Sequence, residues 1–291
     1  MSFLTFSMVV LAALIHATWN LLAKRAAHAG PAFVAATNVV SCMVYLPWVA
    51  WLLARNTLPW SGPVVACIVA SGLLHLAYSL CLQKGYRVAD LSVVYPVARG
   101  TGPLLSSIGA FVLLGETPTG RGLLGLAAIV LGIGLIATQG RLAMFRQARA
   151  LQGVRWGGAT GALIAGYTVV DAYGVKTLGI QAVILDWCSN MVRLCVLLPW
   201  MLRNRANAVA AMRGHWGLAL AVGALSPLSY ILVLEALELG APLSVVAPTR
   251  EMSMMVGALL GMVVLKERVG PGRALGCALL ALGVVLLGTP A

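Results

Sequence analysis

Long apolar stretches follow one another along almost the whole chain, separated by short polar connections. A membrane-spanning helix needs roughly 20 predominantly apolar residues, so this pattern predicts ten spanning helices. Their expected ranges are 3–22, 31–53, 62–83, 91–114, 121–138, 154–173, 180–202, 215–234, 243–265 and 272–288. The longest polar connection, about 139–153, separates the first five spans from the last five.

A short segment occurs twice, half a chain length apart. Leu91–Pro96 reads Leu-Ser-Val-Val-Tyr-Pro, and Leu243–Pro248 reads Leu-Ser-Val-Val-Ala-Pro. Tyr78 precedes the first copy at the same distance as Tyr230 precedes the second. Because each half has an odd number of spans, the second half would enter the membrane from the opposite side, as in the inverted repeats of many transporters. The expected repeats are residues 1–140 and 153–291.

Composition supports a membrane protein and excludes a soluble one. Hydrophobic residues make up 60% of the chain and charged residues 10%, with a mean hydropathy of +0.94, whereas soluble domains carry about 25% charged residues. The expected fold is therefore an all-α integral membrane protein of ten transmembrane helices in two inverted five-helix repeats. Its partners would be the lipid bilayer and a small-molecule substrate, and the chain would be a monomer or a homodimer.

The net charge of +12 is concentrated in alternate loops, which argues against nucleic-acid binding. Fourteen basic residues lie in loops on one side of the predicted membrane, and three lie in the loops on the other side. Cytoplasmic loops carry the excess of Lys and Arg, so both termini are expected on the periplasmic side of the inner (plasma) membrane. The fourteen are Lys24, Arg25, Lys84, Arg87, Arg141, Arg146, Arg149, Arg155, Arg203, Arg205, Arg213, Lys266, Arg268 and Arg273.

The two proline-containing segments carry the charges that are most costly inside a bilayer. Arg99 lies three residues after Pro96, and Glu251, preceded by Arg250, lies three residues after Pro248. Insertion scales assign roughly 2.5–3.5 kcal/mol to such a charge, and a proline frees the carbonyl one turn earlier. We expect Arg99 and Glu251 to neutralise each other or to share a zwitterionic substrate, with both prolines as hinges. An ion pair that only packs helices together is the alternative.

Other spans also carry polar and aromatic residues. His16, Asn20 and Lys24 recur every fourth residue, and His75 and Tyr78 are three apart, so each set shares a helix face. Together they predict a polar cavity between the repeats, although a single such residue can instead satisfy a neighbouring carbonyl. The candidate substrate-binding or coupling residues are Arg99, Glu251, Arg250, Tyr95, His16, Trp19, Asn20, His75, Tyr78, Tyr167, Asp171 and Tyr230.

Some spans are expected to have structural roles. Spans 31–53, 121–138 and 272–288 look apolar apart from small residues, so we expect them to face lipid or to pack the repeats together. Span 180–202 holds Asp186, Asn190 and Arg193, and Arg193 is interpreted either as a cavity residue or as part of a helix-packing group.

The sequence offers little for catalysis or metal binding. The six cysteines are scattered through apolar spans without metal-ligand spacing. The chain has no phosphate-binding loop, no His-x-x-x-His set and only eight dispersed acidic residues. We therefore expect no catalytic residue, no metal and no cofactor, and an intramembrane enzyme is the least favoured class.

The chain resembles the ten-helix EamA branch of the drug/metabolite transporter superfamily, including its YddG-like exporters. The resemblance covers the whole chain. It implies that Glu116 and Glu267 are structural residues at span ends and that a substrate cavity lies between the repeats. The segments that carry it are Ala17–Asn20 with Lys24, Tyr167–Thr168 with Asp171, Leu114–Glu116 and Leu265–Glu267.

The expected function is a secondary transporter that exports amino acids or similar small metabolites by alternating access. A carrier of nucleotide sugars or lipid-linked metabolites is the alternative, although such substrates favour several convergent basic side chains. Proton coupling through Glu251, Asp171, His16 or His75 and facilitated diffusion both remain open.

Overall fold

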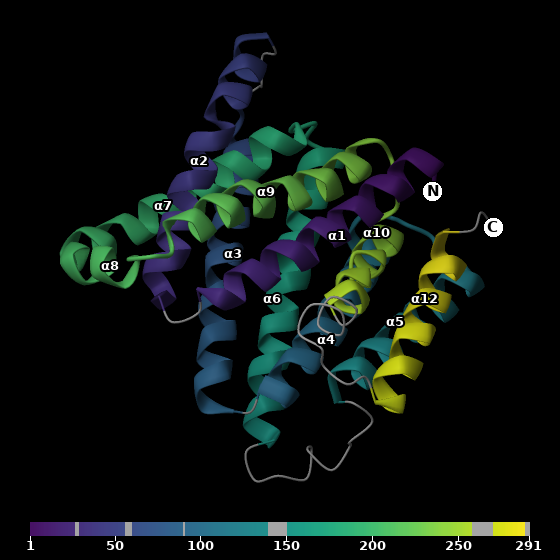
Figure 1. Cartoon of the computed structure of the whole chain (residues 1–291). Coiled ribbons are helices and arrows are strands. Elements are labelled where there is room, and N and C mark those ends of the chain that lie inside the picture. The colour runs from purple at the N-terminus through teal and green to yellow at the C-terminus, as the bar shows by residue number, and fades with distance from the viewer. Residues whose placement is uncertain (27–28, 56–59, 90, 139–149, 258–269, 289–291) are drawn as a thin grey trace.

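The computed structural model describes residues 1–26, 29–55, 60–89, 91–138, 150–257 and 270–288. Figure 1 shows this part of the chain as a bundle of helices without strands. The helices are α1 (Phe3–Arg25), α2 (Gly30–Arg55), α3 (Gly62–Val88), α4 (Leu91–Leu113), α5 (Gly120–Thr138), α6 (Ala150–Lys176), α7 (Ala182–Arg203), α8 (Arg205–Ala211), α9 (Trp216–Glu238), α10 (Leu243–Thr249) and α12 (Pro271–Gly288). Seven of those described, α1, α2, α3, α5, α7, α9 and α12, are long and apolar enough to cross a membrane. The chain is a multi-pass membrane protein.

The helices follow the expected spans in order, with local differences. α4 and α6 are 23 and 27 residues long but are not among the seven, and their sequences contain Arg99 and Asp171 among glycines and hydroxyl residues. α8 was not expected, and its alanine-rich sequence favours a helix.

The helix expected over 243–265 is interrupted at its centre, so the expectation of one continuous helix was wrong. α10 ends after seven residues, and the chain turns at Arg250 and Glu251 before helical geometry resumes at residues 252–257. Pro248 cannot donate to the carbonyl of Ser244, and Ser107 Oγ lies 3.5 Å from that oxygen instead. Residues 258–269, which include Glu267, lie outside the described ranges.

Hydroxyl groups of α2 donate hydrogen bonds to backbone carbonyl oxygens of a second proline-containing helix, α9. Pro227 lies inside α9 and leaves the carbonyl of Gly223 without its helical donor. Ser41 Oγ donates to that oxygen over 2.8 Å, and Tyr45 Oη donates to the carbonyl of Ala224 over 2.6 Å. Lipid cannot donate a hydrogen bond to a freed carbonyl, so these two hydroxyl groups stabilise α9 around its proline.

α5 and α12 lie side by side with their backbones in contact (Figure 1). A Cβ atom on Gly132 would lie 2.7 Å from the backbone oxygen of Gly276, and one on Gly283 would lie 2.7 Å from that of Gly125. Small residues allow this approach and the dispersion contacts that hold helices together in lipid. Of the two roles expected for spans 121–138 and 272–288, facing lipid or packing the repeats together, the structure shows that these two helices pack on each other.

Helices from the two halves of the chain alternate through the rest of the bundle. α1 packs on α9, α4 packs on α6, α3 packs on α6 and α7, and α2 packs on α7 and α9. In Figure 1, α1 and α9 cross the view together while α4 and α6 run beside each other. The space enclosed by these helices is therefore bounded by residues from both halves.

A carboxylate fastens the turn after α4 to the beginning of α10. Glu116 accepts hydrogen bonds from the backbone N–H of Leu243 (2.6 Å), the backbone N–H of Ser244 (2.9 Å) and Ser244 Oγ (2.6 Å), and it pairs with Lys176 Nζ at 3.2 Å. Burial alone would raise the pKa of Glu116, but the Ser244 and Leu243 hydrogen bonds and Lys176 hold it below its usual value. Glu116 thus acts as the N-terminal cap of a helix in the other half.

Candidate substrate cavity

A cavity of about 290 Å³ lies between the two halves. Its size is at the lower end of the roughly 300–1,000 Å³ that is common for ligand pockets. Its polar and aromatic lining consists of His16, Trp19, Thr37, Asn38, Ser41, His75, Tyr78, Ser79, Arg99, Tyr167, Asp186, Asn190, Arg193, Ser226, Ser229, Tyr230 and Arg250. Eight of the twelve residues expected to bind substrate or couple transport are in this set.

Arg99 and Glu251 meet beside the cavity. Arg99 Nε lies 3.2 Å from Glu251 Oε2, an ion pair without hydrogen-bond alignment, and the Glu251 side chain is 1% exposed. Arg99 Nη2 also donates to Ser253 Oγ over 3.3 Å and lies 3.4 Å from His16 Nε2. The guanidinium lies 5.8 Å from the ring centre of Tyr95. The two charges that follow the matched prolines are therefore brought together.

Arg250 presents a second guanidinium to the cavity from the turn that ends α10. Its Nε lies 3.9 Å from Glu251 Oε1, beyond hydrogen-bond distance, and its guanidinium lies 6.0 Å from the ring centre of Tyr230. Within the described part of the chain no hydrogen bond to this guanidinium is formed, although its side chain is 7% exposed. A buried guanidinium without hydrogen-bond partners can bind an anionic group by donating hydrogen bonds to it.

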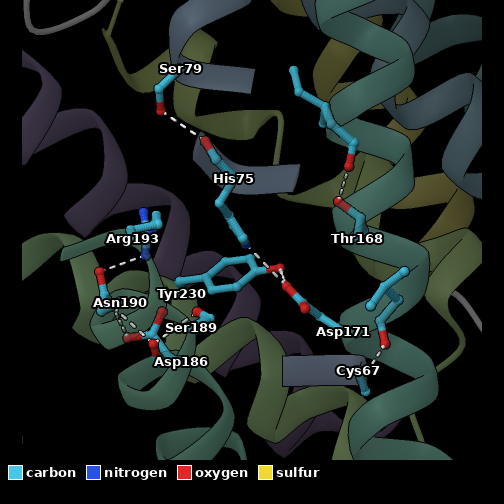
Figure 2. Close-up of polar contacts among 12 residues, drawn as sticks. Cys67, His75, Ser79, Thr168, Asp171, Asp186, Ser189, Asn190, Arg193 and Tyr230 are labelled. Carbon is cyan, nitrogen blue, oxygen red and sulfur yellow. Dashed lines mark hydrogen bonds and ion pairs between the residues drawn. The ribbon is translucent and has the colours of Figure 1, made fainter. Parts of the chain in front are cut away.

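His75, Asp171 and Tyr230 converge from α3, α6 and α9 (Figure 2). His75 Nε2 lies 3.1 Å from Asp171 Oδ2, and Tyr230 Oη donates to the same oxygen over 2.5 Å. The His75 ring stacks on Tyr167 at 3.8 Å between ring centres. Asp171 does not line the cavity itself but lies directly behind two residues that do.

A second polar cluster, on α7, also lines the cavity, which agrees with the cavity interpretation of Arg193 and extends it to two more residues. Asp186 Oδ2 accepts a hydrogen bond from Asn190 Nδ2 (2.9 Å), and Asn190 Oδ1 accepts one from Arg193 Nη2 (2.5 Å). Figure 2 shows this group beside the His75 cluster, and all three side chains line the cavity. Their i, i+4, i+7 spacing places them on one helix face, a signal that pointed to the cavity.

α2 was wrongly expected to lack a polar lining. Its residues Thr37, Asn38 and Ser41 contribute to the cavity wall. In a helix that is apolar elsewhere, three such residues are easily overlooked because hydropathy averaged over the whole span conceals them.

The face of α1 that meets the cavity differs from the expected one. Ala12, His16, Trp19 and Ala23 line the cavity, and Trp19 Nε1 donates to Ser229 Oγ over 3.3 Å. Asn20 is exposed and donates to the carbonyl of His16 in its own helix. The interface follows the 3.6-residue period, which turns position 20 away. The side chain of Lys24 lies outside the described part of the structure.

The first half of the chain matches a known family over nearly its whole length, at residues 4–138. The matching model is that of the EamA-like transporter family, to which these residues are similar. A solved structure titled "Crystal structure of protein" is similar to this chain with a TM-score of 0.73 and 16% sequence identity, over 99% of this chain and 99% of that chain. That likeness shows a shared fold. No curated protein matches the chain.

The cavity combines charge of both signs with an aromatic wall. Arg99, Arg250 and Arg193 face it, and Glu251, Asp171 and Asp186 lie on or behind its surface. Such a lining can hold a small polar molecule by ionic hydrogen bonds while the tyrosine rings contact its apolar part. Among the described residues, no group of three or more His, Cys, Asp or Glu side chains is placed to hold a metal ion.

Proposed function

We propose that the protein is a secondary transporter that exports amino acids or similar small metabolites by alternating access at the central cavity. The observation that carries this proposal is the guanidinium of Arg250. It is buried at the cavity surface, and none of the described residues forms a hydrogen bond with it. A substrate carboxylate would supply the missing acceptors in the two-pronged geometry that Arg favours.

The remaining lining fits the other parts of a small zwitterion. Asp186 places a carboxylate in the cavity wall, where an ammonium group would find an acceptor. Tyr78, Tyr167 and Tyr230 provide ring surface for an apolar side chain. Arg99 is already neutralised by Glu251, which leaves fewer unpaired cations than the several convergent basic side chains that a diphosphate favours. These features favour a small zwitterion over a nucleotide sugar.

The mechanism follows from the proposed organisation of the chain into ten spans, with inverted repeats at 1–140 and 153–291. Tyr78 and Tyr230, which hold matched positions in the two halves, both line the cavity. Pro96 and Pro248 lie three residues from the ion pair, where they serve as hinges. Rocking of one repeat against the other opens the cavity to each side in turn. Both termini would face the periplasm, as the distribution of basic loops requires.

Counterflow in proteoliposomes tests this function. Vesicles preloaded with unlabelled compounds are given radiolabelled amino acids, polyamines or nucleotide sugars, and wild-type protein should accumulate at least one amino acid. The Arg250→Gln variant should lose most of this signal. Arg55→Gln is the matched control, because Arg55 is exposed and stacks only on Trp51. Counterflow of nucleotide sugars but not of amino acids would replace the proposed substrate class.

A further inference from the structure

In the pair formed by His75 and Asp171, the histidine reaches the cavity and the aspartate is buried behind it. The His75 side chain is 11% exposed and lines the cavity, whereas the Asp171 side chain is 1% exposed. Asp171 Oδ2 takes both hydrogen bonds, from His75 and from Tyr230. Oδ1 is buried and has no hydrogen-bond partner in the described part of the chain. Asp171 therefore reaches the cavity through His75 and Tyr230, and of these two side chains His75 is the one whose charge ordinarily changes between pH 5 and 8.

Only one oxygen of the Asp171 carboxylate is hydrogen-bonded, so the energy of the pair depends on how many protons it holds. A buried ionised carboxylate with an unpaired oxygen is costly. One added proton, held on the His75 ring beside the ionised Asp171, makes the pair neutral. When that proton leaves, the pair carries one negative charge on a buried carboxylate. The pair thus has a neutral and a charged state that differ by one proton.

The surrounding groups connect this pair to the proposed substrate site. The nearby charged side chains are Asp186 and Arg193 on α7 and Arg250 after α10. The ring of Tyr167 from α6 stacks on His75, Tyr230 from α9 meets it edge-on, and Tyr78 from α3 packs against Tyr167. Tyr230 bonds to Asp171 while its ring lies 6.0 Å from the Arg250 guanidinium.

We propose that His75 and Asp171 form the proton-coupling site, so that a proton is the second species this transporter moves. The inference rests on the proposed function, because the proton exchanges through the same cavity as the substrate. The proton enters at His75 when the cavity is open to one side, is held between Nε2 of His75 and Oδ2 of Asp171, and leaves by His75 on the other side. Glu251 is a poorer candidate because Arg99 already neutralises it.

The test separates exchange from proton-driven transport. Counterflow at equal pH and net uptake under an imposed pH difference, in both polarities, are measured with a radiolabelled mixture of neutral amino acids. In wild-type vesicles one polarity should raise the steady-state accumulation of label, by up to about tenfold for each unit of pH difference if one proton moves with each substrate. Asp171→Asn should keep most of the counterflow, because Asp171 does not line the cavity, whereas His75→Gln should also lower counterflow because His75 does. Both variants should lose the response to the gradient, so that the ratio of gradient-driven uptake to counterflow falls below the wild-type value. Wild-type counterflow with no response to the gradient would overturn the coupling while leaving the transporter assignment intact.

Asp186→Asn is the matched control, since it removes a buried cavity carboxylate that is bonded to Asn190 and not to His75. It should lower counterflow and gradient-driven uptake together, so that their ratio stays at the wild-type value. Variants that retain the wild-type ratio at position 75 or 171 contradict the proposal.

A measurement without substrate covers the case in which no amino acid is exchanged or one variant fails to fold. Infrared difference spectra of purified protein between about pH 5 and pH 8 should show a histidine protonation signal that His75→Gln removes and Asp171→Asn shifts. Spectra of wild type and His75→Gln that are identical would overturn the proposal independently of any transport assay.

Discussion

Arg99 and Glu251 form an ion pair across the boundary between the two halves of the chain, with 3.2 Å between Arg99 Nε and Glu251 Oε2. The arginine comes from α4 and the glutamate from the turn after α10. Each charge follows its proline by three residues. The pair therefore connects the continuous helix α4 to the turn at which the second proline-containing segment is interrupted.

Reversal of this pair tests whether its charges or only its packing matter. Arg99→Glu and Glu251→Arg should each reduce counterflow by more than tenfold, because an unpaired buried charge costs about 3–5 kcal/mol. The double variant should recover part of the loss. Size-exclusion profiles in detergent separate loss of transport from loss of folding. Normal transport by both single variants would exclude a role for the pair in the substrate cycle.

The contact between α5 and α12 provides a test of the fold with an internal control. Gly132→Val should lower the Tm in detergent, because its Cβ would lie 2.7 Å from the backbone oxygen of Gly276 and 2.8 Å from the nitrogen of Leu280. Overpacking of this kind typically costs about 1–3 kcal/mol. Gly134→Val is the control, because a Cβ at that glycine meets nothing within 4 Å. Equal Tm values for the two variants would contradict the close backbone contact.

Glu116 should contribute to stability although it lies in a turn. Glu116→Ala removes the acceptor for two backbone N–H groups and for Ser244 Oγ, and we expect a loss of about 2 kcal/mol. Glu116→Gln retains one acceptor oxygen and should lose less. Thermal unfolding at pH 7 in detergent ranks the three proteins, and an order other than wild type, Gln, Ala would disprove the capping role.

Because the pKa of Glu116 is lowered in the folded protein, its contribution to stability should fall in acid. A group whose pKa is lower in the folded state stabilises the protein fully above its unfolded-state pKa of about 4.3 and loses that effect as pH falls through the folded-state value. The Tm advantage of wild type over Glu116→Gln should therefore be constant near neutral pH and shrink in acid. A difference that grew on acidification would have the wrong sign.

The sequence predicted the positions of the long helices better than the point at which one of them is interrupted. Hydropathy located the long helices because bilayer thickness fixes their length. It gave no sign that α10 would end at Thr249, since apolar residues continue beyond the turn. Only Pro248 and the charge pair after it indicated a local irregularity, and neither specifies where the helix stops.

The sequence predicted the cavity residues that stand out as polar groups in apolar spans. It missed those whose role depends on contacts in the folded structure. Arg99, His75 and Tyr230 stand out as polar groups in apolar spans, and all three line the cavity. Asn38 and Asn190 also line it but depend on tertiary contacts for their role. No sequence pattern states that Asp171 would lie between His75 and Tyr230, because those partners come from different helices.

The opposite charges at Arg99 and Glu251 also constrain the history of the chain. Two identical copies of the repeat would have carried the same residue after each proline, and the same packing would have set two arginines or two glutamates side by side. Like charges at this separation and depth repel strongly. Under the proposed duplication, an ancestral pair of identical half-length chains could not have had this contact, and the ion pair dates from the time when the two copies were free to differ.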